Sequence, residues 1–91
     1  MQYVICYDVA DDHRRARLAL ALQDFGKRIQ ESVFVANLDA ELAGRMRERA
    51  GRWVDERTDR LHVFALCEAC VGRTEQVGGG PAAGDAEFYI L

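Results

Sequence analysis

The feature that most constrains the fold is an apolar run, residues 3–7, that stops abruptly at acidic residues. The run reads Tyr-Val-Ile-Cys-Tyr, is rich in β-branched and aromatic residues and is too short for a separate helix, which predicts a strand. Because both of its faces are apolar, the strand belongs in the centre of a sheet that is covered on at least one side. Asp8 follows at its exposed end. There it either contributes to a functional site or merely bonds the backbone of a strand-to-helix turn.

Two segments carry apolar residues at helical spacing. The first runs from about residue 11 to 25, with Asp11 or Asp12 as its cap and Gly26 as its C-terminal stop. The second begins after a capping aspartate at position 39 and continues to about Arg57. Its acidic and basic residues interleave, which is typical of a solvated outer face.

Two further segments, residues 27–38 and 59–67, are extended in character. Within the first we predict a short strand at 28–30 and another at 33–37. A single kinked strand is the alternative, because no glycine marks the turn between them. The second segment alternates well and predicts the last strand of the core, in which His62 is given no functional role.

The order strand, helix, strand, strand, helix, strand predicts an α+β, ferredoxin-like βαββαβ sandwich in which two helices cover one face of an antiparallel sheet. This core domain spans residues 1–70. A flexible linker, residues 71–85, contains the only proline and many of the glycines, and residues 86–91 form an apolar C-terminal strand.

The predicted sandwich leaves one face of its sheet bare. A chain of 91 residues buries only about two-thirds of its unfolded surface, so an additional interface would enlarge its core. We therefore expect a homodimer that packs the bare faces together and pairs the strand 86–91 across the dimer. Such a dimer would place the two copies of Asp8 near its twofold axis.

Composition and charge exclude several classes of protein. The net charge of −3 argues against a general nucleic-acid-binding protein. No apolar run approaches the roughly 20 residues of a transmembrane helix, and no basic region precedes the first strand, as it would in a signal peptide. We expect a cytoplasmic protein with no membrane partner.

A basic patch nevertheless lies beside the acidic end of the first strand. Between residues 13 and 28 a single acidic residue faces five basic ones, which are Arg14, Arg15, Arg17, Lys27 and Arg28. Cations in the first turns of a helix oppose its dipole, which favours a ligand-binding reason for these arginines. Such a patch can bind nucleic-acid phosphates although the whole chain is acidic, because charges are screened over about 10 Å. A solvated helix face is the alternative for any single arginine.

The cysteines carry a weaker signal. Cys67-Glu-Ala-Cys70 has the spacing of half a zinc site, but the sequence offers no second such pair, and Cys6 lies in a predicted core strand. We predict that Cys67 is a buried strand residue and Cys70 a loop thiol, with all three cysteines reduced.

Several stretches together resemble the CRISPR-associated protein two family, the small subunits of the spacer-acquisition machinery. They are Tyr-Val-Ile-Cys-Tyr-Asp-Val-Ala-Asp-Asp at 3–12, Arg-Arg-Ala-Arg at 14–17, Arg-Ile-Gln-Glu-Ser-Val-Phe at 28–34, and a final core strand ending Leu66-Cys67. The resemblance covers about residues 1–67. It implies a homodimer of ferredoxin-like protomers that bridges two dimers of the CRISPR-associated integrase. It also implies that the dimer helps to hold a short DNA duplex for insertion into a CRISPR array.

The resemblance also implies that some members cut RNA or DNA with Mg²⁺. The residue that matches Asp8 is the one proposed to hold the metal, and the matching positions implicated alongside it are Tyr7, Arg15, Arg17, Arg28 and Phe34. The chemistry is reasonable, because Mg²⁺ needs only one or two carboxylates together with waters and phosphate oxygens. For the two aromatic residues, core packing is the alternative role.

Our interpretation is a nucleic-acid-binding architectural subunit of the spacer-acquisition integrase complex. The alternative is a Mg²⁺-dependent endonuclease, acting on single-stranded RNA or double-stranded DNA through a pair of Asp8 carboxylates. A toxin-type ribonuclease of the same fold, without an integrase partner, is a third interpretation.

Overall fold

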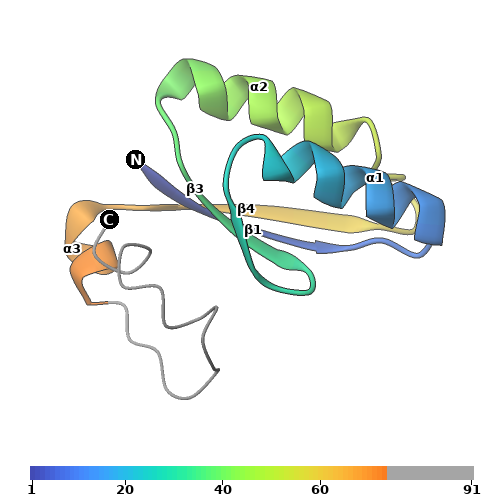
Figure 1. Cartoon of the computed structure of the whole chain (residues 1–91), viewed down its shortest axis with the longest axis horizontal. Helices are drawn as coiled ribbons and strands as arrows, with labels where there is room; N and C mark the ends of the chain where they lie inside the picture. Colours follow the sequence, from blue (N-terminus) through green and yellow to red (C-terminus); the bar gives the residue numbers. More distant parts are fainter. Residues whose placement is uncertain (74–91) are drawn as a thin grey trace.

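The computed structural model describes residues 1–73, which form one four-stranded antiparallel sheet and three helices. The elements follow the order β1 (Gln2–Asp8), α1 (Asp12–Gln23), β2 (Lys27–Gln30), β3 (Val33–Asn37), α2 (Ala40–Gly51), β4 (Arg60–Leu66) and α3 (Glu68–Gly72). In space the strands lie in the order β2-β3-β1-β4, and α1 and α2 cover one face of the sheet (Figure 1). The predicted α+β, ferredoxin-like sandwich is confirmed.

The central position of β1 follows from its apolar sequence. It pairs antiparallel with β3 on one side and with β4 on the other. Alternate residues of β1, namely Tyr3, Ile5 and Tyr7, are buried toward the helices. They join a core whose largest fully buried members are Phe34, Ile5, Leu18, Leu22 and Met46. Burying each large apolar side chain stabilises the fold by roughly 1.5–3 kcal/mol.

The two strands expected between the helices are confirmed, with a register irregularity in the first. β2 and β3 pair antiparallel, but the register shifts between Arg28 and Gln30. The irregularity lies within β2, and the alternative of a single kinked strand is wrong, because β2 and β3 are separate paired strands.

The start of each long helix is confirmed, whereas the predicted end of the second is wrong. Asp11 caps α1 and Asp39 caps α2, each by accepting a backbone N–H three residues later. α2 was expected to continue to about Arg57, but it ends at Gly51. Beyond it the chain turns, and the N–H of Trp53 bonds to the carbonyl of Ala50 at 3.1 Å. The aromatic residue still packs against the core, from a turn after the helix.

The segment after β4 is also corrected. Cys67 is exposed and precedes α3, where a buried strand residue was predicted, and Cys70 lies inside α3 rather than in a loop. Val71 is buried. The first two residues of the predicted linker, 71 and 72, thus belong to a helix. The predicted strand 86–91 and the rest of that linker from residue 74 onward lie outside the described residues.

The sheet face opposite α1 and α2 is here called the open face. It consists of alternate residues of β1 and their register partners on β4, which are Val4, Cys6, Asp8, Arg60, His62 and Phe64. Phe64 is 51% exposed, and its ring stacks on that of His62 with 6.0 Å between ring centroids. Both long helices, α1 and α2, lie on the other side of the sheet (Figure 1). None of the described helices has the length and apolar character needed to cross a membrane.

Candidate nucleic-acid and metal site

Asp8 is the last residue of β1 and lies on the open face. The alternation of the strand turns Tyr7 toward the helices and Asp8 to the opposite side, in register with Arg60 of β4. The side chain of Asp8 is exposed and makes no hydrogen bond or ion pair with residues 1–73. Asp11, not Asp8, caps the following helix. The carboxylate is therefore accessible to a ligand.

Three of the residues that the resemblance implicates alongside Asp8 form one cluster, namely Tyr7, Arg28 and Phe34. The Tyr7 hydroxyl donates to the carbonyl of Glu31 at 3.2 Å, and the guanidinium of Arg28 donates to the same carbonyl at 2.8 Å. The guanidinium also lies 5.7 Å from the centroid of the Phe34 ring. Both aromatic residues are buried, so each has the packing role that was the alternative. The Tyr7 ring lies on the opposite side of β1 from Asp8.

The arginines of α1 do not form one patch, because consecutive helical positions point in different directions. Arg14 pairs with the carboxylate of Asp59 at 2.8 Å, and the guanidinium of Arg17 lies over the ring of Trp53, 5.4 Å from its centroid. Arg15 donates to the carbonyl of Val9 at 2.8 Å and forms an ion pair with Asp12. Each of the three arginines thus has a partner within its own chain.

Arg15 and Arg28 come together at a groove between α1 and β2. Its volume is about 460 Å³, and its lining includes Asp12, Ala16, Leu20 and Glu31 as well as the two arginines. Contacts within the chain hold both guanidinium groups in place without using all of their N–H donors. Of the predicted nucleic-acid-binding arginines, these two share one surface.

Asp59 is a residue of the site region that the sequence did not single out. Its side chain is fully buried and accepts hydrogen bonds from the N–H of Ala10 at 3.0 Å and from the N–H of Asp55 at 2.8 Å, besides the ion pair with Arg14. These two N–H groups, followed by Arg14, hold the pKa of Asp59 well below its usual range although burial opposes ionisation. The hydrogen bond between the side chains of Arg14 and Asp59 raises the pKa of Arg14.

The hydrogen bond that Asp59 accepts from Ala10 holds the loop after Asp8 in place. Ala10 lies two positions beyond the exposed carboxylate, and its N–H is held by a residue 49 positions away in the chain. This contact joins the end of β1 to the start of β4. A positioning role for Asp59 had no signal in the sequence, where it is one of 15 acidic residues.

The donor set at Asp8 fits Mg²⁺ only in part. Carboxylate oxygens are suitable ligands, and Mg²⁺ typically binds through one or two of them and keeps several waters. In residues 1–73 no three His, Cys, Asp or Glu side chains gather as a metal site. Among these residues Asp8 therefore does not belong to a cluster of three such ligands. A substrate phosphate, or Asp8 from a second copy, would have to supply the remaining protein or ligand oxygens.

Comparisons with known proteins agree with this fold. The family model for CRISPR associated protein Cas2 matches residues 1–74. CRISPR-associated endoribonuclease Cas2 1 of Chloroflexus aurantiacus is 38% identical over 93 residues, which cover 100% of each chain. The crystal structure of Streptococcus pyogenes Cas2 at pH 6.5 superposes with a TM-score of 0.75 and 26% identity, covering 86% of this chain and 100% of that one.

A third comparison concerns an assembly. A chain of the partial Cas6-RT-Cas1–Cas2 complex superposes with a TM-score of 0.61 and 26% identity, covering 88% of this chain and 93% of that one. The fold defines a ferredoxin-like α+β protein with an exposed carboxylate at the end of its central strand. The family match is more specific, and the chain belongs to the CRISPR-associated Cas2 family.

Proposed function

We propose that this protein is the nucleic-acid-binding architectural subunit of a CRISPR spacer-acquisition integrase complex, and that it acts as a homodimer. The observation that carries the proposal is the likeness to a chain of a Cas1–Cas2 assembly. In this role the protein holds a short DNA duplex while the integrase subunit performs the insertion. The protein then contributes a binding surface of suitable shape and charge for the DNA, and it performs no chemical step itself.

The open face supports the homodimer. A sheet face bearing Val4, Cys6 and Phe64 is apolar enough to pack against a second sheet at the usual spacing of about 10 Å. An isologous pairing of this face would cover Phe64 in both copies. It would also bring the two Asp8 carboxylates, which lie at the edge of the same face, toward the twofold axis.

The groove that contains Arg15 and Arg28 supports the contact with DNA. Arginine is well suited to phosphate because its planar guanidinium offers several donors in a fixed geometry. Both guanidinium groups are preorganised by contacts to backbone carbonyls, so less side-chain entropy is lost on binding. Such contacts position a duplex without reading its sequence.

The test is spacer integration in a reconstituted mixture of this protein, its cognate integrase, a short DNA duplex, an array and Mg²⁺. Wild type is compared with Asp8→Ala and with the double variant Arg15→Ala, Arg28→Ala. Asp24→Ala, at an exposed acid at the C-terminal end of α1, is the matched control. We expect Asp8→Ala and Asp24→Ala to support integration and the double arginine variant to lose most of it, because phosphate contacts contribute much of the affinity.

Two results would contradict the architectural role. The first is a wild-type protein that forms no complex with the integrase. The second is loss of integration by Asp8→Ala while its complex with the integrase and DNA still assembles, because the carboxylate would then take a direct part in the reaction.

The second candidate is the Mg²⁺-dependent endonuclease, which two observations favour. Relatives such as the Chloroflexus aurantiacus protein are described as endoribonucleases, and Asp8 is exposed on the open face. When bound, Mg²⁺ would neutralise phosphate charge and activate a water. Asp8 would hold the ion, and the buried Asp59 would keep the following loop in place. A nuclease that acts without an integrase would correspond to the toxin-type interpretation.

This candidate is tested with single-stranded RNA and double-stranded DNA, each with Mg²⁺ or with EDTA. We expect any genuine cleavage to disappear with EDTA and with Asp8→Asn, which keeps the shape of the side chain and removes its charge. Equal cleavage by wild type and Asp8→Asn from the same purification would identify a contaminating nuclease.

A further inference from the structure

A pair of thiols lies at the junction of β4 and α3, outside the site described above. The Sγ atoms of Cys67 and Cys70 are 3.3 Å apart, in hydrogen-bond contact, and both residues are exposed. Cys67 is the residue before α3, and Cys70 follows it by three positions, so the first turn of this short helix brings the two side chains together. The third cysteine, Cys6, lies on β1 and takes no part in this contact.

The geometry of this pair is close to that of a disulfide. A disulfide has an S–S length of about 2.05 Å, so the two sulfur atoms need to approach by only a little over 1 Å. Rotation about the side-chain bonds of two exposed residues supplies such a movement without displacing the core. The exposure of both sulfurs also gives a small disulfide reagent access to either one.

The two thiols are electrostatically unequal. The backbone N–H of Cys70 and the Cys70 thiol lower the pKa of Cys67. The same interaction with Cys67 raises the pKa of Cys70. Because the thiolate is the reactive form, Cys67 is the better nucleophile of the pair near neutral pH.

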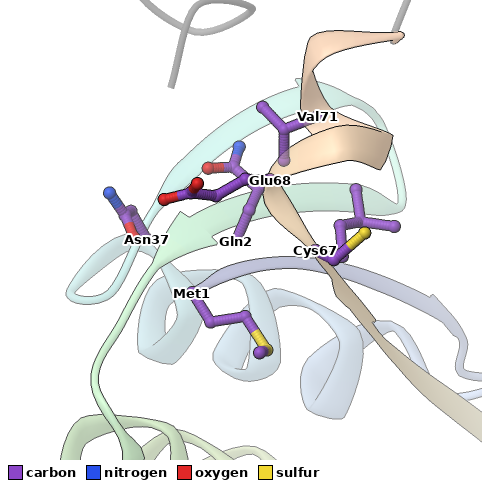
Figure 2. Close-up of a pocket in the computed structure, with 7 residues that line it drawn as sticks. Met1, Gln2, Asn37, Cys67, Glu68 and Val71 are labelled. Carbon is purple, nitrogen blue, oxygen red and sulfur yellow. The ribbon is translucent and has the colours of Figure 1, made fainter.

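A pocket beside Cys67 offers room for a reagent. It has a volume of about 340 Å³, and Figure 2 shows Met1, Gln2, Asn37, Glu68 and Val71 around it together with Cys67. The side chain of Gln2 is 7% exposed, and its Oε1 atom is buried without a hydrogen-bond partner. The pocket leaves room for a small disulfide reagent beside Cys67.

We propose that Cys67 and Cys70 form a reversible redox site that exchanges with small peptide disulfides such as glutathione disulfide. The Cys67 thiolate attacks one sulfur of the reagent, forms a mixed disulfide and releases one glutathione thiolate. Cys70 then loses its proton, and its thiolate attacks the Cys67 sulfur, which releases the second glutathione. The protein loses two electrons and two protons, and one glutathione disulfide becomes two glutathione molecules.

A zinc site is a weaker interpretation of the same two residues. Structural zinc sites in proteins have four ligands, and in residues 1–73 no third His, Cys, Asp or Glu gathers with Cys67 and Cys70. Disulfide exchange needs only the two sulfurs that are already in contact. It depends neither on the dimer nor on the integrase.

The test uses the reduced full-length protein and its variants Cys6→Ser, Cys67→Ser and Cys70→Ser, equilibrated with mixtures of reduced and oxidised glutathione. Intact mass and peptide mapping follow the thiols, and circular dichroism checks that each variant is folded. We expect wild type and Cys6→Ser to form a disulfide between Cys67 and Cys70, which removes two hydrogen atoms from the mass of the protein. Cys70→Ser should accumulate glutathione on Cys67, several-fold faster than Cys67→Ser accumulates it on Cys70.

Three results would overturn the proposal. The first is a wild-type protein that keeps both thiols reduced in excess glutathione disulfide. The second is a disulfide that maps to Cys6. The third is equal reaction rates for Cys67→Ser and Cys70→Ser, because the sulfurs would then not differ as the structure requires.

Discussion

The same strands form both faces of the sheet. The helices α1 and α2 cover one face, and they leave the open face uncovered (Figure 1). On the side covered by the helices, Phe34 of β3 is fully buried, and the buried carboxylate of Asp59, in the loop before β4, pairs with Arg14 of α1. On the open face, Phe64 is 51% exposed, and Asp8 has no side-chain partner among residues 1–73. A phenylalanine and an aspartate on each side of the sheet thus have contrasting surroundings.

This contrast shows how one strand serves two purposes. Side chains of a strand alternate, so β1 contributes Tyr7 to the core and the next residue, Asp8, to the surface. The covered face stabilises the single chain, and the open face has both apolar area and an acid left for interactions with other molecules. Substitutions of the same kind on the two faces should therefore have very different effects.

The largest effect is expected for Phe34→Ala on the covered face. Removing a fully buried aromatic ring should lower the free energy of unfolding by about 3–5 kcal/mol, because it loses apolar burial and leaves a cavity. Urea unfolding followed by circular dichroism measures the loss. A loss below about 1 kcal/mol would show that the covered face is not the core of the protein.

Asp59→Asn should have the next largest effect, and its pH dependence separates it from a packing defect. The folded-state pKa of Asp59 lies below the unfolded value of about 3.9, so ionised Asp59 stabilises the fold above that pH. This contribution is lost as the pH falls through the folded-state pKa. The variant should be clearly less stable than wild type at neutral pH, and the difference should shrink below about pH 4.

Thermal unfolding of both proteins between neutral pH and about pH 3 provides the measurement. Arg14→Leu is the companion variant, because it leaves the buried carboxylate without its cation. A difference between wild type and Asp59→Asn that stays constant with pH would assign the effect to packing, not to charge.

Phe64→Ser on the open face should leave the single chain folded and weaken self-association. Truncating a central interface aromatic can cost more than about 1 kcal/mol of binding, which corresponds to a rise of at least about fivefold in Kd. Sedimentation at several protein concentrations measures this change. Leu20→Ser, at a 54% exposed residue on α1, is the control and should leave the association unchanged.

The smallest effect on stability is expected for Asp8→Asn. The side chain is exposed, so the free energy of unfolding should change by less than about 0.5 kcal/mol. A small increase in self-association is also expected, because in the proposed homodimer two Asp8 carboxylates near the twofold axis would repel each other. A large loss of stability would instead assign Asp8 a structural role.

The succession of strands and helices was predictable because it depends on local pattern. The apolar run of β1 and the capping aspartates at positions 11 and 39 determine where elements begin. The end of α2 was not predictable in this way. Trp53 continues the helical spacing of apolar residues, yet it reaches the core from a turn, and the sequence pattern does not distinguish these two routes.

The candidate site was predictable only where one residue acts alone. Asp8 could be proposed from its place after an apolar strand. Which arginines share a surface depends on partners that are distant in sequence. Arg14, for example, pairs with Asp59, which is 45 positions away. The contact of Cys67 with Cys70 was missed for a different reason, because the short helix α3 that joins them lies where a loop was expected.

The central place of β1 also affects how the chain can fold during its synthesis. β1 leaves the ribosome well before β4, residues 60–66, which is one of its two neighbours in the sheet. Until then its apolar residues have an incomplete sheet around them, and the bond between Ala10 and Asp59 cannot form. Folds that depend on such distant contacts fold slowly. A nascent chain of this protein is therefore expected to remain open to chaperones and proteases until nearly the whole described domain has been translated.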